Sequence, residues 1–358
     1  MRRSETVPYR ALDGFQCNLV HWYDTEIPST RGPVVLVHGA GVRGNIFNAP
    51  NRMNLIHMLL DHGYDVWLNN WRASIDLEFN EYDLDQAAVY DHPAAVRRIL
   101  GETGYDELKA VIHCQGSTSF MISLVTGLVP EVRAVVTNAV SLHPVVPRWS
   151  AIKLSYLLPV LRPVLTHVDA QWARKPTGFW PWMVNGMAQL AHREPDTPVG
   201  RLASFMFGAG FPAMWSLENL SPETKEWIQD EFGKVPLTFY THIAKSVRAG
   251  QLVSNGRVAE GLPRRYAHDE PKTDARFSLF AGRKNRTFLW ESQKQSFDFL
   301  DRFRPGFHSL HILDDYSHLD VFQGKNAHRD VLPIMIQELD RTPLGSRSSF
   351  RIHRRPDS

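Results

Sequence analysis

Short apolar runs alternate with segments of helical spacing over roughly the first 140 residues. The apolar runs predict buried strands at residues 34–37, 65–68, 108–112 and 132–137. Helical spacing bounded by start and stop residues predicts helices at 54–62 and 91–100, and a third helix is expected after Gly116. Strands that alternate with helices favour an α/β fold with a mostly parallel central sheet and flanking helices.

The pattern changes at about residue 145 and the α/β alternation returns at 275. Between these points prolines recur, strand patterns disappear, and six of the ten tryptophans are found: Trp149, Trp172, Trp180, Trp182, Trp215 and Trp227. We interpret residues 145–274 as an inserted helical cap that closes over something apolar. The alternative is that the tryptophans form the core of the insertion itself.

The remaining pattern completes the predicted organisation. Strands are expected at 277–281 and 308–313, and helices at 291–303 and 327–339. The sequence therefore predicts an N-terminal core part at 1–144, the cap at 145–274, and a C-terminal core part at 275–342. Residues 343–358 form a short basic tail, for which we expect disorder, with contact to a membrane surface or a partner as the alternative.

Composition and charge exclude several classes of function. With 40 basic and 38 acidic residues, a net charge of +2 gives no electrostatic reason to expect nucleic acid. Cys17 and Cys114 are the only cysteines, so a disulfide framework is not expected. The N-terminus has no apolar stretch typical of a secretory signal, and the most apolar segment, 154–168, is interrupted by prolines and an arginine. We therefore expect a cytoplasmic protein.

A sharp strand-to-helix turn is predicted within AVIHCQGSTSF, residues 110–120. In many hydrolases this turn carries Gly-x-Ser-x-Gly with the nucleophilic serine at its tip. Here Cys114 occupies the tip, Gly116 supplies the small residue after it, and Ile112 departs from the pattern. The start of the following helix favours a thiolate, which makes Cys114 the candidate nucleophile. The alternatives are that Cys114 is a small buried apolar residue, or that Ser117 is the nucleophile.

The residues after the first predicted strand suit the stabilisation of an oxyanion. In VVLVHGAG, glycines allow the backbone to approach a substrate closely, and we expect the backbone N–H groups of Ala40 and Gln115 to be the donors. Substrate contacts are expected from the same loop and from two tryptophans of the cap: His38, Gly39, Gly41, Trp180 and Trp182.

His318 is the candidate base, because it follows the last predicted strand and precedes the final helix. The position after the 277–281 strand, where an acid would orient the base, holds Asn285. A thiol needs its imidazole oriented more than charged, so an amide suits Cys114, as in Cys-His-Asn triads. The alternative is that an ancestral catalytic serine and acid were lost together with the activity, which would leave the same residues at positions 114 and 285. Other acids near His318 in the chain are substitutes for Asn285: Asp314, Asp315 and Asp320.

Motifs for metals and cofactors are weak. GAGVRG, residues 39–44, has the Gly-x-Gly-x-x-Gly spacing of a dinucleotide site. In that fold, however, the first strand opens the domain and an acid ends the second strand. Here about 30 residues precede the first of these strands, and the second strand runs into Asn69 and Asn70. We therefore predict no cofactor and no metal.

Four segments taken together resemble the acid lipases of the lysosomal and gastric type, within the α/β-hydrolase superfamily. They are GYDVWLNNWR (63–72), YDHPAAVRRIL (90–100), HCQGST (113–118) and YSHLDVFQGKNAHRDV (316–331). The resemblance covers roughly residues 30–145 and 275–340. It implies Cys114 as nucleophile, His318 as base, Asn285 in the acid position, and Ala40 with Gln115 as oxyanion donors. The chain departs from these lipases at Cys114 and Asn285.

Two further resemblances bear on function. A thiol at this turn is similar to polyhydroxyalkanoate synthases and dienelactone hydrolases. WRASIDL (71–77) resembles hydrolase-like modules associated with cholesterol-oxidase-type enzymes, which implies bulky lipid substrates and contact with a membrane or a partner oxidoreductase. We expect a Cys-His hydrolase of apolar acyl esters or thioesters that acts through a thioester acyl-enzyme. The alternatives are an acyltransferase and a non-catalytic protein that binds lipid or a partner.

Overall fold

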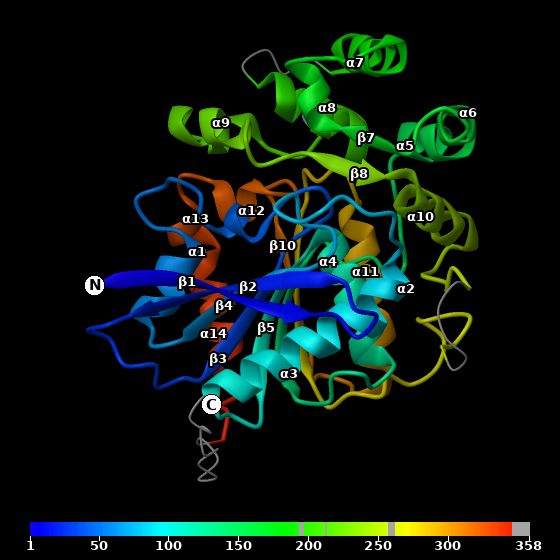
Figure 1. Cartoon of the computed structure of the whole chain (residues 1–358). Helices are drawn as coiled ribbons and strands as arrows, with labels where there is room; N and C mark the ends of the chain where they lie inside the picture. The colour runs from blue at the N-terminus through cyan, green and yellow to red at the C-terminus, as the bar shows by residue number, and fades with distance from the viewer. Residues whose placement is uncertain (193–196, 212, 257–261, 346–358) are drawn as a thin grey trace, which may run out of the picture.

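The central element of the structure is an eight-stranded sheet with strand order β1-β2-β4-β3-β5-β6-β9-β10 (Figure 1). The computed structural model describes residues 1–358 except 193–196, 212, 257–261 and 346–358. The strands are β1 (Arg2–Arg10), β2 (Gln16–Asp24), β3 (Pro33–Val37), β4 (Asp65–Asn70), β5 (Leu108–His113), β6 (Val132–Asn138), β9 (Arg276–Gly282) and β10 (Ser309–Leu313). All neighbours from β4 to β10 pair in parallel. The predicted α/β fold is therefore confirmed.

Helices cover both faces of this sheet. They include α1 (Leu55–Asp61), α3 (His92–Thr103), α4 (Cys114–Val125), α11 (Trp290–Phe303), α12 (Asp320–Gln323), α13 (Ala327–Asp330) and α14 (Leu332–Asp340), with shorter turns η1 (Gly44–Phe47), α2 (Leu84–Gln86) and η2 (Ala87–Asp91). Successive side chains of a strand point to opposite faces. Val35 and Val37 accordingly pack in one hydrophobic core, and Val34 and Leu36 in the other. This double burial explains why the strands read as continuous apolar runs.

Two features of the core differ from the predictions. The N-terminal strands β1 and β2 form an antiparallel pair at the sheet edge that we did not predict, because their residues are polar and mostly exposed or half-buried. The expected final helix is divided into α13 and α14 at Val331, whose φ of −124° leaves the helical region. Pro333 accounts for this break, because it has no N–H and its ring clashes with the carbonyl four residues before it.

Most helices and strands between β6 and β9 lie over one end of the sheet, at the top of Figure 1, and α10 leads from there down its right side. The elements of this segment are α5 (Arg148–Ile152), η3 (Lys153–Leu157), α6 (Leu158–Leu161), β7 (His167–Asp169), η4 (Ala170–Ala173), α7 (Phe179–Ala191), α8 (Pro198–Phe207), η5 (Leu217–Asn219), α9 (Pro222–Ile228), β8 (Lys234–Pro236) and α10 (Leu237–Ala249). We refer to these elements as the cap. The expected absence of strands is wrong, because β7 and β8 form a short antiparallel pair.

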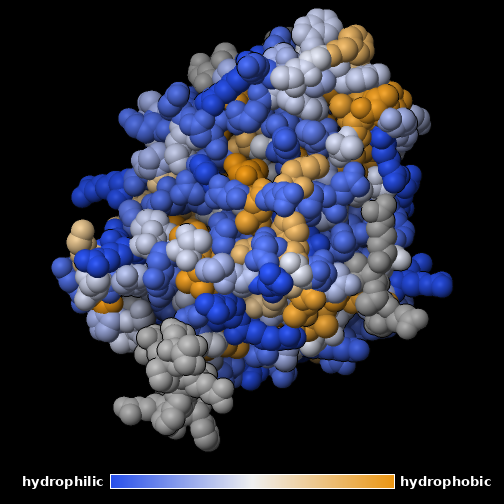
Figure 2. All heavy atoms as spheres, viewed as in Figure 1, coloured by the Kyte–Doolittle hydropathy of each residue, from blue (hydrophilic) through white to orange (hydrophobic). Residues whose placement is uncertain are grey.

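The outer surface of the cap is unusually apolar. It carries most of the large hydrophobic side chains that are exposed in the described residues: Trp149, Tyr156, Val160, Val164, Phe179, Trp182, Leu190 and Phe211. Figure 2 shows apolar side chains gathered over part of the cap at the upper right. In the described ranges no helix combines the length and the apolar character needed to cross a bilayer. Most of the predicted tail lies outside the described residues.

The loop after β3 packs directly on the start of α4. A Cβ atom at Gly116 would lie 2.0 Å from the carbonyl oxygen of His38, and one at Gly39 would lie 3.0 Å from the Cβ of Cys114. Both glycines are therefore required by close approach of the two backbones, which agrees with the expected need for a small residue after Cys114.

We expect Gly116→Ala to lower the free energy of unfolding by about 3 kcal/mol or more, because a backbone carbonyl must move to admit the methyl group. Gly101→Ala is the matched control, since Gly101 lies exposed in α3 with no atom within 4 Å of the added Cβ. This control is expected to stabilise by up to about 1 kcal/mol. Urea denaturation measures both, and equal stabilities of the two variants would contradict the prediction.

Candidate active site

Cys114 lies at the turn between β5 and α4 with a φ of 54°. In the described residues only one other non-glycine residue, Ala139, has a positive φ. A left-handed backbone at a non-glycine residue costs about 1–3 kcal/mol and is concentrated at functional sites. Cys114 is 5% exposed. The strained strand–turn–helix is the geometry predicted for a nucleophile at this position.

The structure brings Cys114, His318 and Asn285 together. One nitrogen each of His318 and His113 and the sulfur of Cys114 all lie within 4.8 Å of one another. His318 comes from the loop after β10, and Asn285 from the loop after β9. The Nδ2 atom of Asn285 lies 3.0 Å from Nδ1 of His318. The carboxyl ends of parallel strands meet at one edge of a sheet, which is why these distant residues converge.

The alternative residues are engaged elsewhere. Asp314 and Asp315 pair with Arg283 and Lys284. Asp320 is buried and accepts the backbone N–H of Ser317 at 2.9 Å. The hydroxyl of Ser117 is buried and forms a 2.5 Å hydrogen bond with Thr137. No hydrogen bond within the described residues joins these acids to the imidazole of His318, so Asn285 is the group that orients it.

The amide of Asn285 faces His318 with its nitrogen, because its oxygen is held by another group. Oδ1 of Asn285 accepts the backbone N–H of Thr287 at 2.8 Å. An amide nitrogen only donates, so Nδ1 of His318 accepts, and neutral His318 carries its proton on Nε2. In Ser-His-Asp triads the third member accepts from the imidazole instead. In this arrangement His318 cannot take a proton from Cys114 until Asn285 changes its orientation.

A second amide, that of Asn138, also faces an imidazole with its nitrogen. Nδ2 of Asn138, at the end of β6, lies 3.0 Å from Nδ1 of His113 and 2.9 Å from the carbonyl oxygen of His318. Sequence reasoning missed Asn138 and His113 as members of the site. Their positions in the sequence could have indicated them, because His113 and Asn138 are the last residues of two neighbouring strands, β5 and β6. In this arrangement both imidazoles thus carry their protons on Nε2.

Burial sets the protonation of the two reacting groups. It raises the pKa of the Cys114 thiol to about 12, an effect that the backbone N–H of Gln115 only partly offsets. It lowers the pKa of His318 to about 3. The site therefore holds a thiol and a neutral imidazole at neutral pH. The thiolate that the start of the helix is expected to favour is not formed, because desolvation outweighs the hydrogen bond from the N–H of Gln115.

The expected oxyanion loop is rigid. Nδ1 of His38 bonds the carbonyl oxygen of Gly39 at 2.7 Å, and the carbonyl of His38 accepts the indole N–H of Trp71 at 2.9 Å. Gln115 is the second residue of α4, so its N–H has no acceptor within the helix. Ala40 is buried in the same loop. The positions of Ala40 and Gln115 are compatible with the predicted donor roles, which stay predictions.

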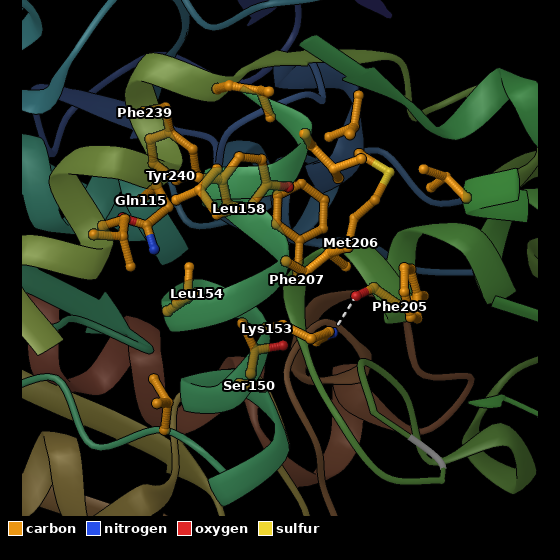
Figure 3. Close-up of a pocket in the computed structure, with 18 of the residues that line it drawn as sticks. Gln115, Ser150, Lys153, Leu154, Leu158, Phe205, Met206, Phe207, Phe239 and Tyr240 are labelled. Carbon is orange, nitrogen blue, oxygen red and sulfur yellow. Dashed lines mark hydrogen bonds between the residues drawn. The ribbon is translucent and has the colours of Figure 1, made fainter. Parts of the chain in front are cut away.

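An apolar cavity opens beside Gln115, between the core and the cap (Figure 3). Its walls come mainly from η3, α6, α8 and α10. The predicted contacts of the cap and the loop lie elsewhere: Trp180, Trp182, His38, Gly39 and Gly41 do not line it.

Three of these residues lie outside the cavity lining for a physical reason. Val184 of α7 lines the cavity, and a residue two positions away on a helix points elsewhere, so Trp182 is 65% exposed. Trp180 packs against Phe179, with 5.3 Å between the centres of the two rings. Gly41 instead lets β8 approach the loop, since a Cβ there would lie 2.3 Å from Val235.

We expect Cys114 to be alkylated by iodoacetamide at pH 8 about a thousandfold more slowly in the folded protein than in urea. The reason is that a pKa of about 12 leaves that much less thiolate than the usual value of 9. The rate should rise about tenfold per pH unit above pH 8. Peptide mass mapping separates Cys114 from buried Cys17. Equal rates in folded and unfolded protein would refute the raised pKa.

Comparison with known sequences points to lipases and esterases over part of the chain. No family model matches the sequence. Sterol esterase 2 of Saccharomyces cerevisiae is 31% identical over 131 residues, 32% of this chain and 24% of that protein. Rat gastric triacylglycerol lipase is 37% identical over 109 residues, which cover 27% of this chain and 27% of the lipase. Human lipase member K is 36% identical over 126 residues, which cover 32% of this chain and 31% of that protein. The match thus spans about a quarter to a third of these relatives' lengths.

Solved structures match the whole fold. The epoxide hydrolase VrEH1 of Vigna radiata superposes with a TM-score of 0.58 at 14% identity, and covers 95% of this chain and 98% of its own. A thermophilic esterase of Thermogutta terrifontis gives a TM-score of 0.54 at 13% identity, with coverage of 95% and 98%. At such low identity these likenesses establish architecture rather than activity. The chain has the α/β-hydrolase fold.

Proposed function

We propose that this protein hydrolyses apolar carboxylic esters or thioesters, with Cys114 as the nucleophile. The observation that carries the proposal is the left-handed turn that presents Cys114 beside His318 and Asn285. The apolar cavity beside Gln115 supports an apolar substrate. The names of the partial relatives, a sterol esterase and a triacylglycerol lipase, support ester substrates. The apolar outer surface of the cap suits approach from a lipid phase.

The proposed reaction has two halves. The sulfur of Cys114 forms a bond to the carbonyl carbon while its proton passes to Nε2 of His318. The carbonyl oxygen becomes an oxyanion that accepts the N–H groups of Ala40 and Gln115. Its collapse expels the alcohol or thiol, which takes the proton from His318 and leaves a thioester on Cys114. Water then attacks the thioester with His318 as base, releases the acid and restores the thiol.

The first proton transfer requires Asn285 to rotate. Nε2 of His318 can accept a proton only when Nδ1 holds the other one, and Nδ1–H needs an acceptor. A half-turn of the Asn285 amide supplies Oδ1 and breaks its hydrogen bond with the N–H of Thr287. Losing that bond costs about 1 kcal/mol or more. We therefore propose that the described arrangement is a resting state and that substrate binding accompanies the rotation.

The central test is acyl-enzyme formation. We expect incubation with p-nitrophenyl butyrate to give release of nitrophenol and an acyl adduct in the intact mass spectrum, both abolished in Cys114→Ala. Turnover that survives in Cys114→Ala would overturn the assignment of the nucleophile. No adduct and no turnover with esters or thioesters would overturn the proposed function. An adduct that discharges only to added alcohol or amine would replace hydrolysis by acyl transfer.

We expect Asn285→Asp to raise kcat for the same ester at least about tenfold, because a carboxylate accepts Nδ1–H without rotation and still accepts the N–H of Thr287. Asn285→Ala is the control, since it removes the amide and orients nothing. The pH profile is the decisive readout, because only a change in the base shifts its acid limb. An unchanged rate and profile in Asn285→Asp would show that the amide does not limit the proton transfer.

A further inference from the structure

The apolar cavity contains polar atoms that have no partner. Four such buried atoms belong to residues that line it: Oε1 of Gln115, Oγ of Ser150, the hydroxyl of Tyr240 and Oγ1 of Thr287, none of which has a hydrogen bond within the described residues. A buried polar group left unsatisfied costs about 1–3 kcal/mol. A cavity meant for a plain hydrocarbon chain would carry none of these groups. The lining therefore indicates a ligand with polar groups at defined places.

These groups lie at two separate places. Figure 3 shows Gln115 and Tyr240 on one side of the cavity, and Ser150 close to Lys153 on another. Gln115 follows Cys114 directly, so its side belongs to the reacting carbonyl. Ser150 and Lys153 belong to α5 and η3 of the cap and have no part in the proposed reaction. They form a polar end that lies on another side of the cavity from Gln115, the residue next to Cys114 in the chain.

Lys153 is the basic group of the cavity lining, and it has no counter-ion among the described residues. Its Nζ donates to the carbonyl oxygens of Phe205 and Gly208, the latter at 2.5 Å, and lies 4.6 Å from the centre of the Phe205 ring. No carboxylate of the described residues forms an ion pair with it, and Lys153 is the single charged residue of the cavity lining. Burial lowers its pKa to about 7. Lys153 is half-buried, so its ammonium form is only partly hydrated, and an anion beside it would favour that form.

We propose that Ser150 and Lys153 form a binding site for a carboxylate, carried at the far end of an apolar ligand that fills the cavity. The remaining N–H of Lys153 and the hydroxyl of Ser150 are two donors, and a carboxylate offers two oxygens to accept them. A neutral hydroxyl in the ligand would satisfy Ser150 and leave the ammonium charge uncompensated. Resting on the proposed function, the inference names the substrate class: apolar esters with a carboxylate at the end opposite the reacting bond, such as half-esters of dicarboxylic acids.

Paired substrates test the preference. We expect p-nitrophenyl hydrogen suberate and sebacate to have kcat/KM values at least about tenfold above those of p-nitrophenyl octanoate and decanoate, an effect typical of a desolvated ion pair. Lys153→Met should abolish the ratio by reducing turnover of the half-esters alone. Lys245→Met is the matched control, since Nζ of Lys245 also donates to a backbone carbonyl, at 2.7 Å, but lies exposed outside the cavity.

A binding measurement separates this site from the reaction. In the Cys114→Ala protein we expect calorimetry to show decanoate binding that weakens about tenfold in Lys153→Met and also weakens in Ser150→Ala, while decanol binding is unchanged. Decanoate binding without turnover of any ester would refute the proposed function and leave the carboxylate site standing. Equal decanoate affinity in both cavity variants and the parent protein, or no preference between the paired esters in wild type, would overturn the site.

Discussion

The close packing of the turn at Cys114 is the constraint on which the rest of the site depends. The loop after β3 presses on the start of α4, and Gly39 and Gly116 leave room for no side chain between them. This contact holds Cys114 in a left-handed conformation that an isolated chain would avoid. It also places the N–H of Gln115 next to the sulfur. One packing arrangement therefore produces both the strained turn and the position of the loop that holds the proposed oxyanion donors.

The same burial that holds the turn decides its chemistry. Desolvation raises the pKa of Cys114 and lowers that of His318, so neither group is charged in the closed site. In the proposed reaction, proton transfer then depends on which end of the Asn285 amide faces His318. Because the N–H of Thr287 holds Oδ1 of Asn285, the amide nitrogen faces His318 and fixes a proton on Nε2. An amide in place of an acid at position 285 thus removes a charge, and it also reverses the direction of the hydrogen bond with Nδ1 of His318.

Core and cap contribute different parts of the proposed substrate site. The core supplies the proposed nucleophile, base and oxyanion donors from the carboxyl edge of the parallel sheet. The cap supplies the apolar walls and the Ser150–Lys153 end. In this proposal the reacting groups and the groups that select the substrate belong to separate segments of the chain, so a cap substitution is expected to change substrate preference without disturbing the turn at Cys114.

The sequence by itself determined the parallel core and the positions of Cys114, His318 and Asn285, because buried strands read as apolar runs and their ends mark the functional edge. It could not reveal the β1–β2 pair, whose residues are polar, or that Trp182 points outward. Only the tertiary structure decided the direction of the Asn285 amide, the pKa values, and the place of Lys153 in the cavity. These depend on neighbours distant in sequence, on a hydrogen bond from the N–H of Thr287 and on burial by the folded chain, none of which a local sequence pattern records.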